Sequence, residues 1–318
     1  MDNESLTLAE GQKHGQAAEQ KPVPDQARPS DTPPACLSLA VLSGKGGVGK
    51  TNLTLNLALA LEEAGEKSLV VDGDLGLANI DVLLGLAPEG SLQDFLLGRA
   101  RLEDIVVRVS PGLDVLPAAS GAEDLVTVTQ ASRGLLADSL APHLAGYGFV
   151  FLDLGAGIAA NVRELSALAR MKLVVTTPEP TALTDCYALM KVLNASQGIV
   201  DFACIVNCVQ EEGEEAFTVQ RLGGACSRFL GFEPRFLGAV RQDPAVAKAI
   251  CLREPLLRRF LESPAARDLR AIAGRLLAER ASLQAQGLLD PPLAAPAGAR
   301  AADETAGETA GQGGEKSP

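Results

Sequence analysis

The chain has 318 residues, a formal net charge of −12 at pH 7 and 47% hydrophobic residues, which are values typical of an acidic globular protein. This charge argues against a general nucleic-acid binder, because such proteins gain most of their affinity from cationic side chains that neutralise phosphates. His14 and His143 are the only histidines, so His-rich metal centres are excluded. We find no export signal and no apolar stretch near the ~20 residues that span a bilayer, and we expect a cytoplasmic protein.

The two ends of the chain have the composition of disordered tails. Residues 1–35 are rich in Glu, Gln, Pro and Ala, and residues 288–318 are rich in Ala, Gly, Pro and Glu. Such segments cannot bury enough apolar area to offset the conformational entropy lost on folding. We therefore expect one folded domain over residues 36–287, between an N-terminal tail and an acidic C-terminal tail.

Between the tails, short apolar runs alternate with helical patterns. The predicted strands are Leu37–Leu42, Ser68–Asp72, Leu113–Leu116, Phe149–Asp153, Lys172–Thr177, Phe202–Asn207 and Phe236–Val240. The predicted helices are Lys50–Ala64, Leu135–Ala145, Asn161–Arg170, Leu183–Ala195, Ala216–Phe229, Ala245–Cys251 and Ala265–Ala278. Several strands are continuous apolar runs, which is typical of parallel strands covered on both faces. The alternation predicts an α/β fold with a doubly wound, mostly parallel sheet of about seven strands.

A glycine-rich segment, GKGGVGKT, joins the first predicted strand to the first predicted helix. This is the Walker A pattern in the context that it requires, since glycines let backbone N–H groups wrap around phosphates at a helix N-terminus. We expect Lys50 to reach the β and γ phosphates and the Thr51 hydroxyl to bind Mg²⁺. The remaining residues of the predicted ATP cradle are Gly44, Lys45, Gly46, Gly47, Val48 and Gly49.

Carboxylates follow two of the predicted strands. Asp72 and Asp74 end the second strand, and Asp153 ends the fourth. The carboxyl ends of parallel strands face the crevice where open α/β sheets bind ligands. A Mg·ATP site needs oxygens that hold the ion and an oxygen that orients the attacking water, so these three residues complete a predicted ATPase site.

The second lysine of the loop narrows the class. The run KGGVGKT, with Lys45 as a signature lysine, resembles the deviant Walker A group of MinD/ParA ATPases. The resemblance implies that Lys45 crosses a homodimer interface to the ATP of the other subunit. It also implies that Asp74 positions the hydrolytic water, that Asp153 is the Walker B aspartate near Mg²⁺ and that Asp72 supports the metal shell.

Two further runs, residues 74–81 (DLGLANID) and 177–185 (TPEPTALTD), resemble the FlhG (FleN) branch of this family over roughly residues 37–280. The resemblance implies a slow, Mg-dependent ATPase that dimerises with ATP and regulates the placement or number of flagella. It implies a flagellar protein or an FlhF-like GTPase as partner. Family members read the nucleotide base with an Asn and a G-x-[IV]-P-x-D turn, which Asn207 and Asp243 match here, with Arg241 where proline is usual.

The chain departs from the family at both ends. FlhG and MinD proteins often end in a basic amphipathic helix that binds membrane, and this acidic C-terminal tail has none, so we expect any contact with the inner membrane to be transient and through a partner. We expect the basic segment 253–261 (REPLLRRFL) to pack against the core. Asp25-Gln26-Ala27 matches only the start of the D-Q-A-x-x-L-R motif that activates FlhF, so that activity stays open.

Other functions of the same fold remain as alternatives. A ParA-like ATPase that partitions DNA or cargo is disfavoured by the negative charge. A metal or cluster carrier usually needs a cysteine pair, and the six cysteines (36, 186, 204, 208, 226, 251) include no C-x-x-C; we expect them to be buried free thiols. A biosynthetic ligase would need a second constellation for a carboxylate substrate, and we find none.

Overall fold

The structure is a computed structural model that describes residues 35–119, 127–289 and 293. Most of both predicted tails, including Asp25-Gln26-Ala27, lies outside the described residues, and the domain boundaries stay predictions.

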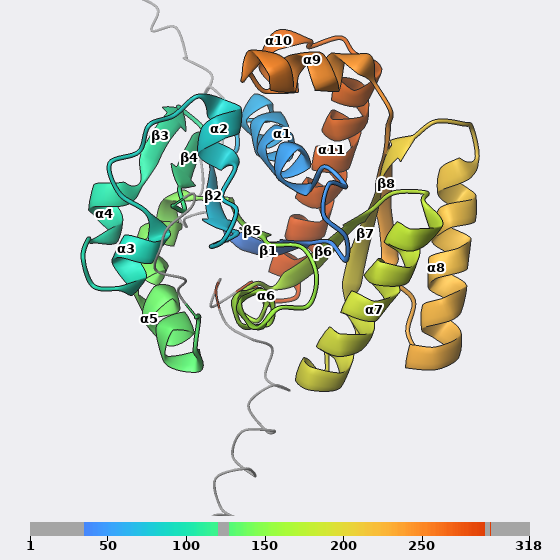
Figure 1. The fold of residues 1–318 in the computed structure, drawn as a ribbon, viewed down its shortest axis with the longest axis horizontal. Helices are drawn as coiled ribbons and strands as arrows, with labels where there is room; N and C mark the ends of the chain where they lie inside the picture. The colour runs from blue at the N-terminus through green and yellow to red at the C-terminus, as the bar shows by residue number, and fades with distance from the viewer. Residues whose placement is uncertain (1–34, 120–126, 290–292, 294–318) are drawn as a thin grey trace, which may run out of the picture. The chain divides into compact units, whose positions relative to one another are not determined.

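The described residues form an eight-stranded sheet in the order β3-β4-β2-β5-β1-β6-β7-β8 (Figure 1). All neighbouring strands are parallel except β3, which is antiparallel to β4. The strands are β1 Leu37–Leu42, β2 Ser68–Gly73, β3 Val107–Ser110, β4 Leu113–Leu116, β5 Phe149–Leu154, β6 Met171–Thr176, β7 Phe202–Val209 and β8 Arg235–Arg241. The predicted doubly wound, mostly parallel sheet is confirmed, with eight strands in place of about seven.

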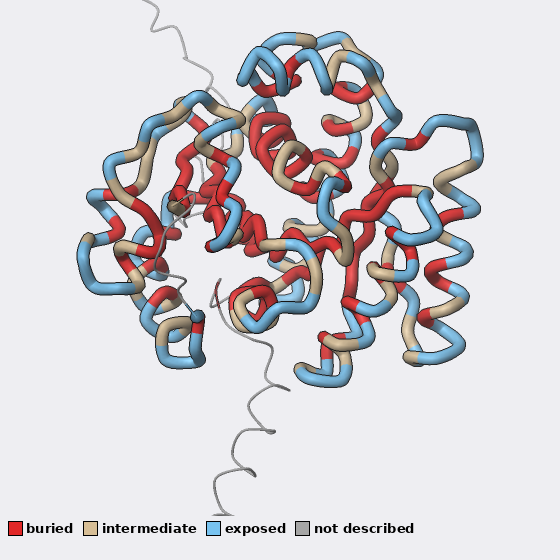
Figure 2. Tube along the Cα trace, viewed as in Figure 1, coloured by how far each residue is buried: buried red, intermediate tan, exposed pale blue. Residues whose placement is uncertain are grey.

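Helices cover both faces of the sheet. They are α1 Lys50–Glu63, α2 Ile80–Leu84, α3 Leu92–Leu96, α4 Leu102–Ile105, α5 Gln130–Leu140, the 3₁₀ helix η1 Ala141–Gly146, α6 Ala160–Ser166, α7 Pro180–Gln197, α8 Glu214–Leu230, α9 Pro244–Leu252, α10 Leu256–Arg259 and α11 Pro264–Ala285. Figure 1 shows α1, α9, α10 and α11 on one face and α5, α6, α7 and α8 on the other. Each face encloses its own apolar core, so the central strands are buried along their whole length (Figure 2).

Strand β3 is the one element of the sheet that the sequence pattern misses. It has four residues, lies at the sheet edge and is only half-buried. An edge strand covered on one side has no continuous apolar run, and four residues are too few to establish an alternating pattern. The seven predicted strands agree with β1, β2 and β4–β8 to within two residues at each end.

Helix α1 is more deeply buried than an amphipathic pattern implies. Every residue from Leu53 to Leu61 is buried, because α1 lies between the sheet and α11. Among them the side chain of Asn56 accepts a hydrogen bond from Leu257 N (3.0 Å) at the start of α10. Leu256 and Leu257 are also buried, which confirms the prediction that segment 253–261 packs against the core.

The cysteines are all free thiols. The prediction that they are buried is confirmed for Cys36, Cys186, Cys204 and Cys226 and wrong for the other two. Cys208 lies where the pairing of β7 shifts register, in a left-handed conformation with φ 58°. Cys251 lies on the outer side of α9, whose buried residue is Ala249. None of the described helices is long and apolar enough to cross a membrane.

Candidate nucleotide-binding site

The predicted phosphate loop joins β1 to α1, at the centre of the sheet's carboxyl edge. Gly47 and Gly49 have φ angles of 80° and 86°, a left-handed conformation that favours glycine. A Cβ at Gly44 would collide with the backbone of Asp185. A Cβ at Gly49 would lie 2.5 Å from Nδ2 of Asn207. Glycine is therefore favoured by close approach at Gly44, by backbone angle at Gly47 and by both at Gly49.

The loop presents backbone donors to a ligand. Gly49 is the N-cap of α1, and no side chain of the described residues caps that N-terminus. The first N–H groups of a helix have no partner within the helix and carry partial positive charge. This arrangement suits an anion such as a phosphate.

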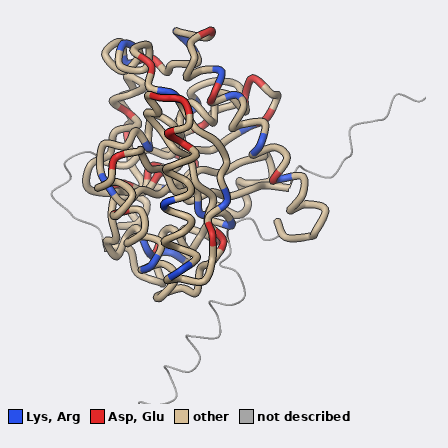
Figure 3. Tube along the Cα trace, turned by 90° about the vertical axis from the view of Figure 1, so that its right-hand side faces the viewer, with Lys and Arg blue, Asp and Glu red and all other residues tan. Residues whose placement is uncertain are grey.

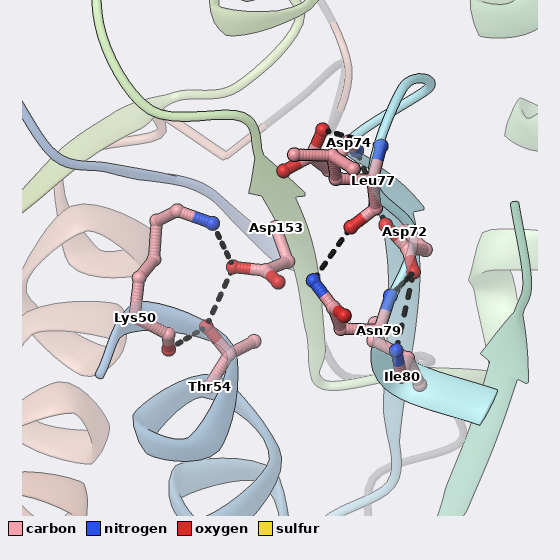
Figure 4. A network of polar contacts seen from close by, with 8 residues as sticks. All are labelled: Lys50, Thr54, Asp72, Asp74, Leu77, Asn79, Ile80 and Asp153. Atoms are coloured by element: carbon pink, nitrogen blue, oxygen red, sulfur yellow. Dashed lines mark hydrogen bonds and ion pairs between the residues drawn. The ribbon is translucent and has the colours of Figure 1, made fainter. Parts of the chain in front are cut away.

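Lys50 is buried against Asp153, the predicted Walker B aspartate (Figure 4). Its Nζ donates to Oδ1 of Asp153 at 2.9 Å, and the two side chains are only 8% and 1% exposed. Thr54 Oγ1 donates to the same oxygen at 3.3 Å. Two predicted site residues that are 103 positions apart thus meet at the carboxyl ends of neighbouring strands β1 and β5.

Two buried oxygens beside this ion pair have no hydrogen-bond partner among the described residues: Oδ2 of Asp153 and Oγ of Ser43. An unsatisfied buried polar atom costs roughly 1–3 kcal/mol. A hydroxyl and a carboxylate oxygen are donors that Mg²⁺ and its bound waters accept as ligands. The residues present therefore fit a Mg-nucleotide.

Asp72 is the register partner of Asp153 on β2 and is almost fully buried. Its Oδ1 accepts from Asp74 N (3.1 Å), and its Oδ2 accepts from Asn79 N (3.3 Å) and Ile80 N (3.4 Å) (Figure 4). Burial and, secondly, the charge of Asp153 raise the pKa of the Asp72 carboxyl to about 7, although the three N–H groups lower it. In this structure Asp72 holds the 74–80 loop and the start of α2, and its role toward a metal stays a prediction.

This carboxyl gives a testable pH dependence. In the range from about pH 4 to about pH 7, folded Asp72 keeps a proton that the unfolded chain has lost, so the free energy of unfolding should fall as pH rises through that range. The contribution is fully present below about pH 4. Asp153→Asn removes one cause of the raised pKa, and the fall should then end at a lower pH. Urea denaturation at a series of pH values measures both effects.

The carboxyls with lowered pKa values serve as an internal control. Asp114 and Asp243, for example, lose their stabilising contribution only as pH drops below the unfolded pKa of 3.8. Their titration therefore does not change the free energy of unfolding between pH 4 and pH 7. A free energy of unfolding that stays flat or rises between pH 4 and pH 7 would contradict the assignment.

Asp74 lies beside the loop that follows β5. Its Oδ1 accepts from Leu77 N at 3.2 Å, and a Cβ at Gly155 would lie 3.3 Å from the same oxygen. The backbone N of Gly157 in turn donates to Ser43 O at 2.9 Å, at the base of the phosphate loop. Asp74, the predicted water-positioning residue, thus lies against the loop after β5, and that loop in turn contacts the base of the phosphate loop.

A cavity of about 410 Å³ opens above the phosphate loop, within the range of small-molecule sites. Its walls include seven predicted site residues: Gly46, Gly47, Val48, Gly49, Lys50, Thr51 and Asp74. The lining residues that the sequence analysis did not single out are Ser43, Asn52, Asn79, Val82, Leu83, Ala156 and Ile250. Asn79 lies within the DLGLANID run, which was a usable signal. Ile250 comes from α9, about 200 residues further along, and no sequence signal indicated it.

The two predicted base-reading residues lie outside that lining. Asn207 Nδ2 donates to Val48 O at 2.8 Å, so it contacts the phosphate loop directly. Asp243 is the N-cap of α9: its Oδ1 accepts from Ala245 N (2.8 Å) and its Oδ2 from Ala265 N (3.1 Å) at the start of α11. These bonds give Asp243 a structural task, and its role in base recognition stays a prediction.

Arg241 shows how the chain accommodates its departure from the family turn. Its backbone N donates to Oδ2 of Asp268 at 3.0 Å, and its guanidinium makes two further bonds of 2.8 and 2.7 Å to the same carboxylate. A proline at this position has no N–H to donate. Asp268 on α11 thus holds the turn at Arg241 through an ion pair, in place of the rigid ring that a proline would supply.

Lys45 points away from the buried ion pair. It is 40% exposed, and its Nζ donates to Oε2 of Glu179 at 2.7 Å and to Oγ1 of Thr181 at 3.1 Å. Both partners lie at the start of α7. The two lysines of one loop therefore occupy different environments, one buried at the carboxyl edge and one at the surface.

Known proteins of similar sequence and structure include nucleotide-binding proteins, in agreement with this geometry. Residues 39–256 match the model of the CobQ/CobB/MinD/ParA nucleotide binding domain. The antiactivator FleN of Pseudomonas aeruginosa is 35% identical over 238 residues, 75% of this chain and 85% of its own length. The flagellum site-determining protein YlxH of Helicobacter pylori is 31% identical over 76% of this chain and 82% of its own. The septum site-determining protein MinD of Pyrococcus horikoshii, solved with Mg-ADP, superposes with a TM-score of 0.65 at 27% identity, covering 76% of this chain and 97% of that one.

Proposed function

The chain belongs to the CobQ/CobB/MinD/ParA family of nucleotide-binding proteins, and we propose that it is a slow ATPase that dimerises on binding ATP and regulates the number or placement of flagella. The observation that carries the proposal is that the two lysines of the loop lie in different environments. Lys50 is buried against Asp153, where it would contact the bound phosphates. Lys45 is at the surface, held by Glu179 and Thr181, and would leave these contacts to reach a second subunit.

In this proposal residues 44–51 hold the phosphates through backbone N–H groups and Lys50. Thr51 and Asp153 bind Mg²⁺, and Asp72 supports the metal shell. The bound ion would neutralise charge on the β and γ phosphates. Asp74 accepts a hydrogen bond from a water and orients it toward the γ phosphorus, where a new P–O bond forms as the bond to the β-phosphate oxygen breaks and ADP leaves. Asn207 and Asp243 bind on the base side.

The flagellar assignment rests on relatives. The name of the Helicobacter protein, a flagellum site-determining protein, connects it to flagella, and the Pseudomonas relative is the antiactivator FleN, whose branch of the family residues 74–81 and 177–185 resemble. We propose that this chain acts with a flagellar protein or an FlhF-like GTPase, in the cytoplasm and transiently at the inner membrane through that partner, without binding nucleic acid directly.

Analytical ultracentrifugation of the full chain tests the biochemical part. We expect a monomer without nucleotide or with ADP, and a dimer with Mg²⁺ and a non-hydrolysable ATP analogue. Counting flagella by electron microscopy after deletion of the gene in its host tests the biological part. A dimer that ignores nucleotide, or a deletion strain with wild-type flagella, would contradict the corresponding part of the proposal.

The Lys45 ion pair gives a further prediction. Glu179→Gln should lower the ATP concentration at half-maximal dimerisation, because Lys45 no longer has to leave a carboxylate before it reaches the other subunit. An exposed ion pair contributes about 0–1 kcal/mol, so the shift should be at most about fivefold. Light scattering against ATP concentration measures it. Glu212→Gln, at an exposed position just before α8 and far along the chain, is the matched control. A higher ATP requirement for Glu179→Gln would mean that Glu179 acts within the dimer instead.

A further inference from the structure

Gln93 of α3 is a buried polar residue that the nucleotide site does not explain, with only 3% of its surface exposed. Figure 3 marks the charged residues of the chain, and among the described residues only five of them are buried: Lys50, Asp72, Asp114, Asp153 and Lys172. Burial of strongly polar side chains is therefore selective in this fold. A buried polar side chain is costly unless its hydrogen-bonding groups find partners, so the partners of Gln93 indicate what the residue does.

The amide of Gln93 is bonded to three backbone groups. Its Oε1 accepts from Ala119 N at 2.8 Å, and its Nε2 donates to Ala119 O at 3.1 Å. The amide oxygen can only accept and the amide nitrogen can only donate, so the N–H group of Ala119 determines which way the amide faces. Nε2 also donates to Leu75 O at 3.2 Å. The residue therefore joins the segment after β4 to the loop after β2.

Leu75 directly follows Asp74, the residue that we propose orients the attacking water. The hydrogen bond that the Asp74 side chain accepts comes from Leu77 N, within the same loop, so the position of its carboxylate depends on the backbone of that loop. This backbone is held on both sides of Asp74. The N–H group of Asp74 donates to Oδ1 of Asp72 at 3.1 Å, and the carbonyl of the next residue accepts from Gln93.

Helix α3, which carries Gln93, is attached to the sheet. Isolated helices of five residues are not stable in water, and here a capping box fixes the first turn: Ser91 Oγ accepts from Asp94 N at 3.3 Å, and Asp94 Oδ2 accepts from Ser91 N at 3.0 Å. Leu92 is fully buried, and its N–H group donates to Pro117 O at 2.7 Å, just beyond β4. Gln93 thus holds Leu75 from a fixed base.

We propose that Gln93 is a positioning residue for ATP hydrolysis. Its amide holds the backbone at Leu75 and thereby keeps the Asp74 carboxylate where it can accept a hydrogen bond from the attacking water. Gln93 is not among the described residues that line the cavity, so it acts through Asp74 and not on the nucleotide. The inference rests on the proposed ATPase function and adds a further residue to it.

Gln93→Met tests the proposal, because methionine has a similar length and lacks the amide. We expect kcat for ATP hydrolysis to fall about tenfold, since misplacement of a reacting group by about 1 Å costs up to about 100-fold. KM for ATP should stay within about twofold of wild type, as expected when only the transition state loses an interaction. Phosphate release from radiolabelled ATP, measured over a range of ATP concentrations, gives both values.

Gln93→Met should also lower the melting temperature, because it leaves buried backbone groups without partners. Tyr147→Phe is the matched control. It removes a buried hydrogen bond of 2.6 Å, from the Tyr147 hydroxyl to Oδ2 of Asp114, before the amino end of β5 and thus at the opposite edge of the sheet from the nucleotide site. It should lower the melting temperature without changing kcat. Gln93→Glu is a second variant in case methionine prevents folding: its carboxylate can still accept from Ala119 N but cannot donate to Leu75 O, so kcat should again fall.

A double variant shows whether Gln93 acts through Asp74. In D74A the group to be positioned is absent, so D74A/Q93M should hydrolyse ATP as slowly as D74A, whereas independent effects would multiply. Wild-type turnover in D74A would contradict the proposed ATPase mechanism itself. Slow turnover in D74A together with unchanged kcat in Q93M would overturn the inference about Gln93 alone. A further tenfold loss in the double variant would also overturn it, because Gln93 would then act independently of Asp74.

Discussion

Lys50→Ala is expected to lose ATP binding by at least about 100-fold, because the phosphates lose their main cation and the backbone N–H groups alone retain only weak affinity. The structure adds a second effect. Lys50 neutralises Asp153, whose carboxylate is 1% exposed, and removal of one partner from a buried pair costs roughly 3–5 kcal/mol of stability. Titration with a fluorescent ATP analogue and urea denaturation measure the two effects.

A double variant separates binding from folding. Lys50→Ala with Asp153→Asn removes the uncompensated buried charge, so most of the lost stability should return while ATP binding stays lost. Lys248→Ala, which changes an exposed lysine on α9, is the control for the loss of one positive charge. Near-wild-type ATP affinity in Lys50→Ala would refute the assignment of the phosphate loop.

Asp74→Ala is expected to lower the rate of ATP hydrolysis by about 100-fold or more, since a positioned group that orients the attacking water contributes at least that much. Asp74 is partly exposed, and among the described residues its side chain accepts one hydrogen bond, from Leu77 N. We therefore expect little change in stability. ATP binding and dimerisation should remain, so that the dimer accumulates in the presence of ATP. Phosphate release and light scattering, measured together, show both effects.

Lys45→Ala is the matched comparison, because it should lose dimerisation while it keeps ATP binding. It keeps Lys50 and Thr51, and hence Mg·ATP binding, but loses the side chain that reaches across the dimer. Its only described contacts, to Glu179 and Thr181, are at the surface, so the monomer should stay folded. A stable Lys45→Ala dimer, or a monomeric Asp74→Ala with ATP bound, would show that the nucleotide switch works differently.

The sequence by itself determined the fold class and the centre of the site. Strands buried on both faces must be apolar along their whole length, so runs such as Phe149–Asp153 were identifiable without any knowledge of their neighbours. The phosphate loop was identifiable because a helix N-terminus that binds phosphate needs consecutive glycines and Lys50 at fixed spacing. These are local requirements, and a local pattern is enough to reveal them.

Tertiary structure alone decided the contacts between distant segments. The pairing of Lys45 with Glu179 joins residues 134 positions apart, and the placement of Ile250 in the cavity wall depends on where α9 packs. Asp243 matched a family motif, yet its oxygens are occupied by the N-termini of two helices. The pKa of Asp72 is raised first by its burial within the fold and secondly by the charge of Asp153, which β5 places beside it. Strand register, helix packing and burial set these relations, and no stretch of sequence around either partner encodes them.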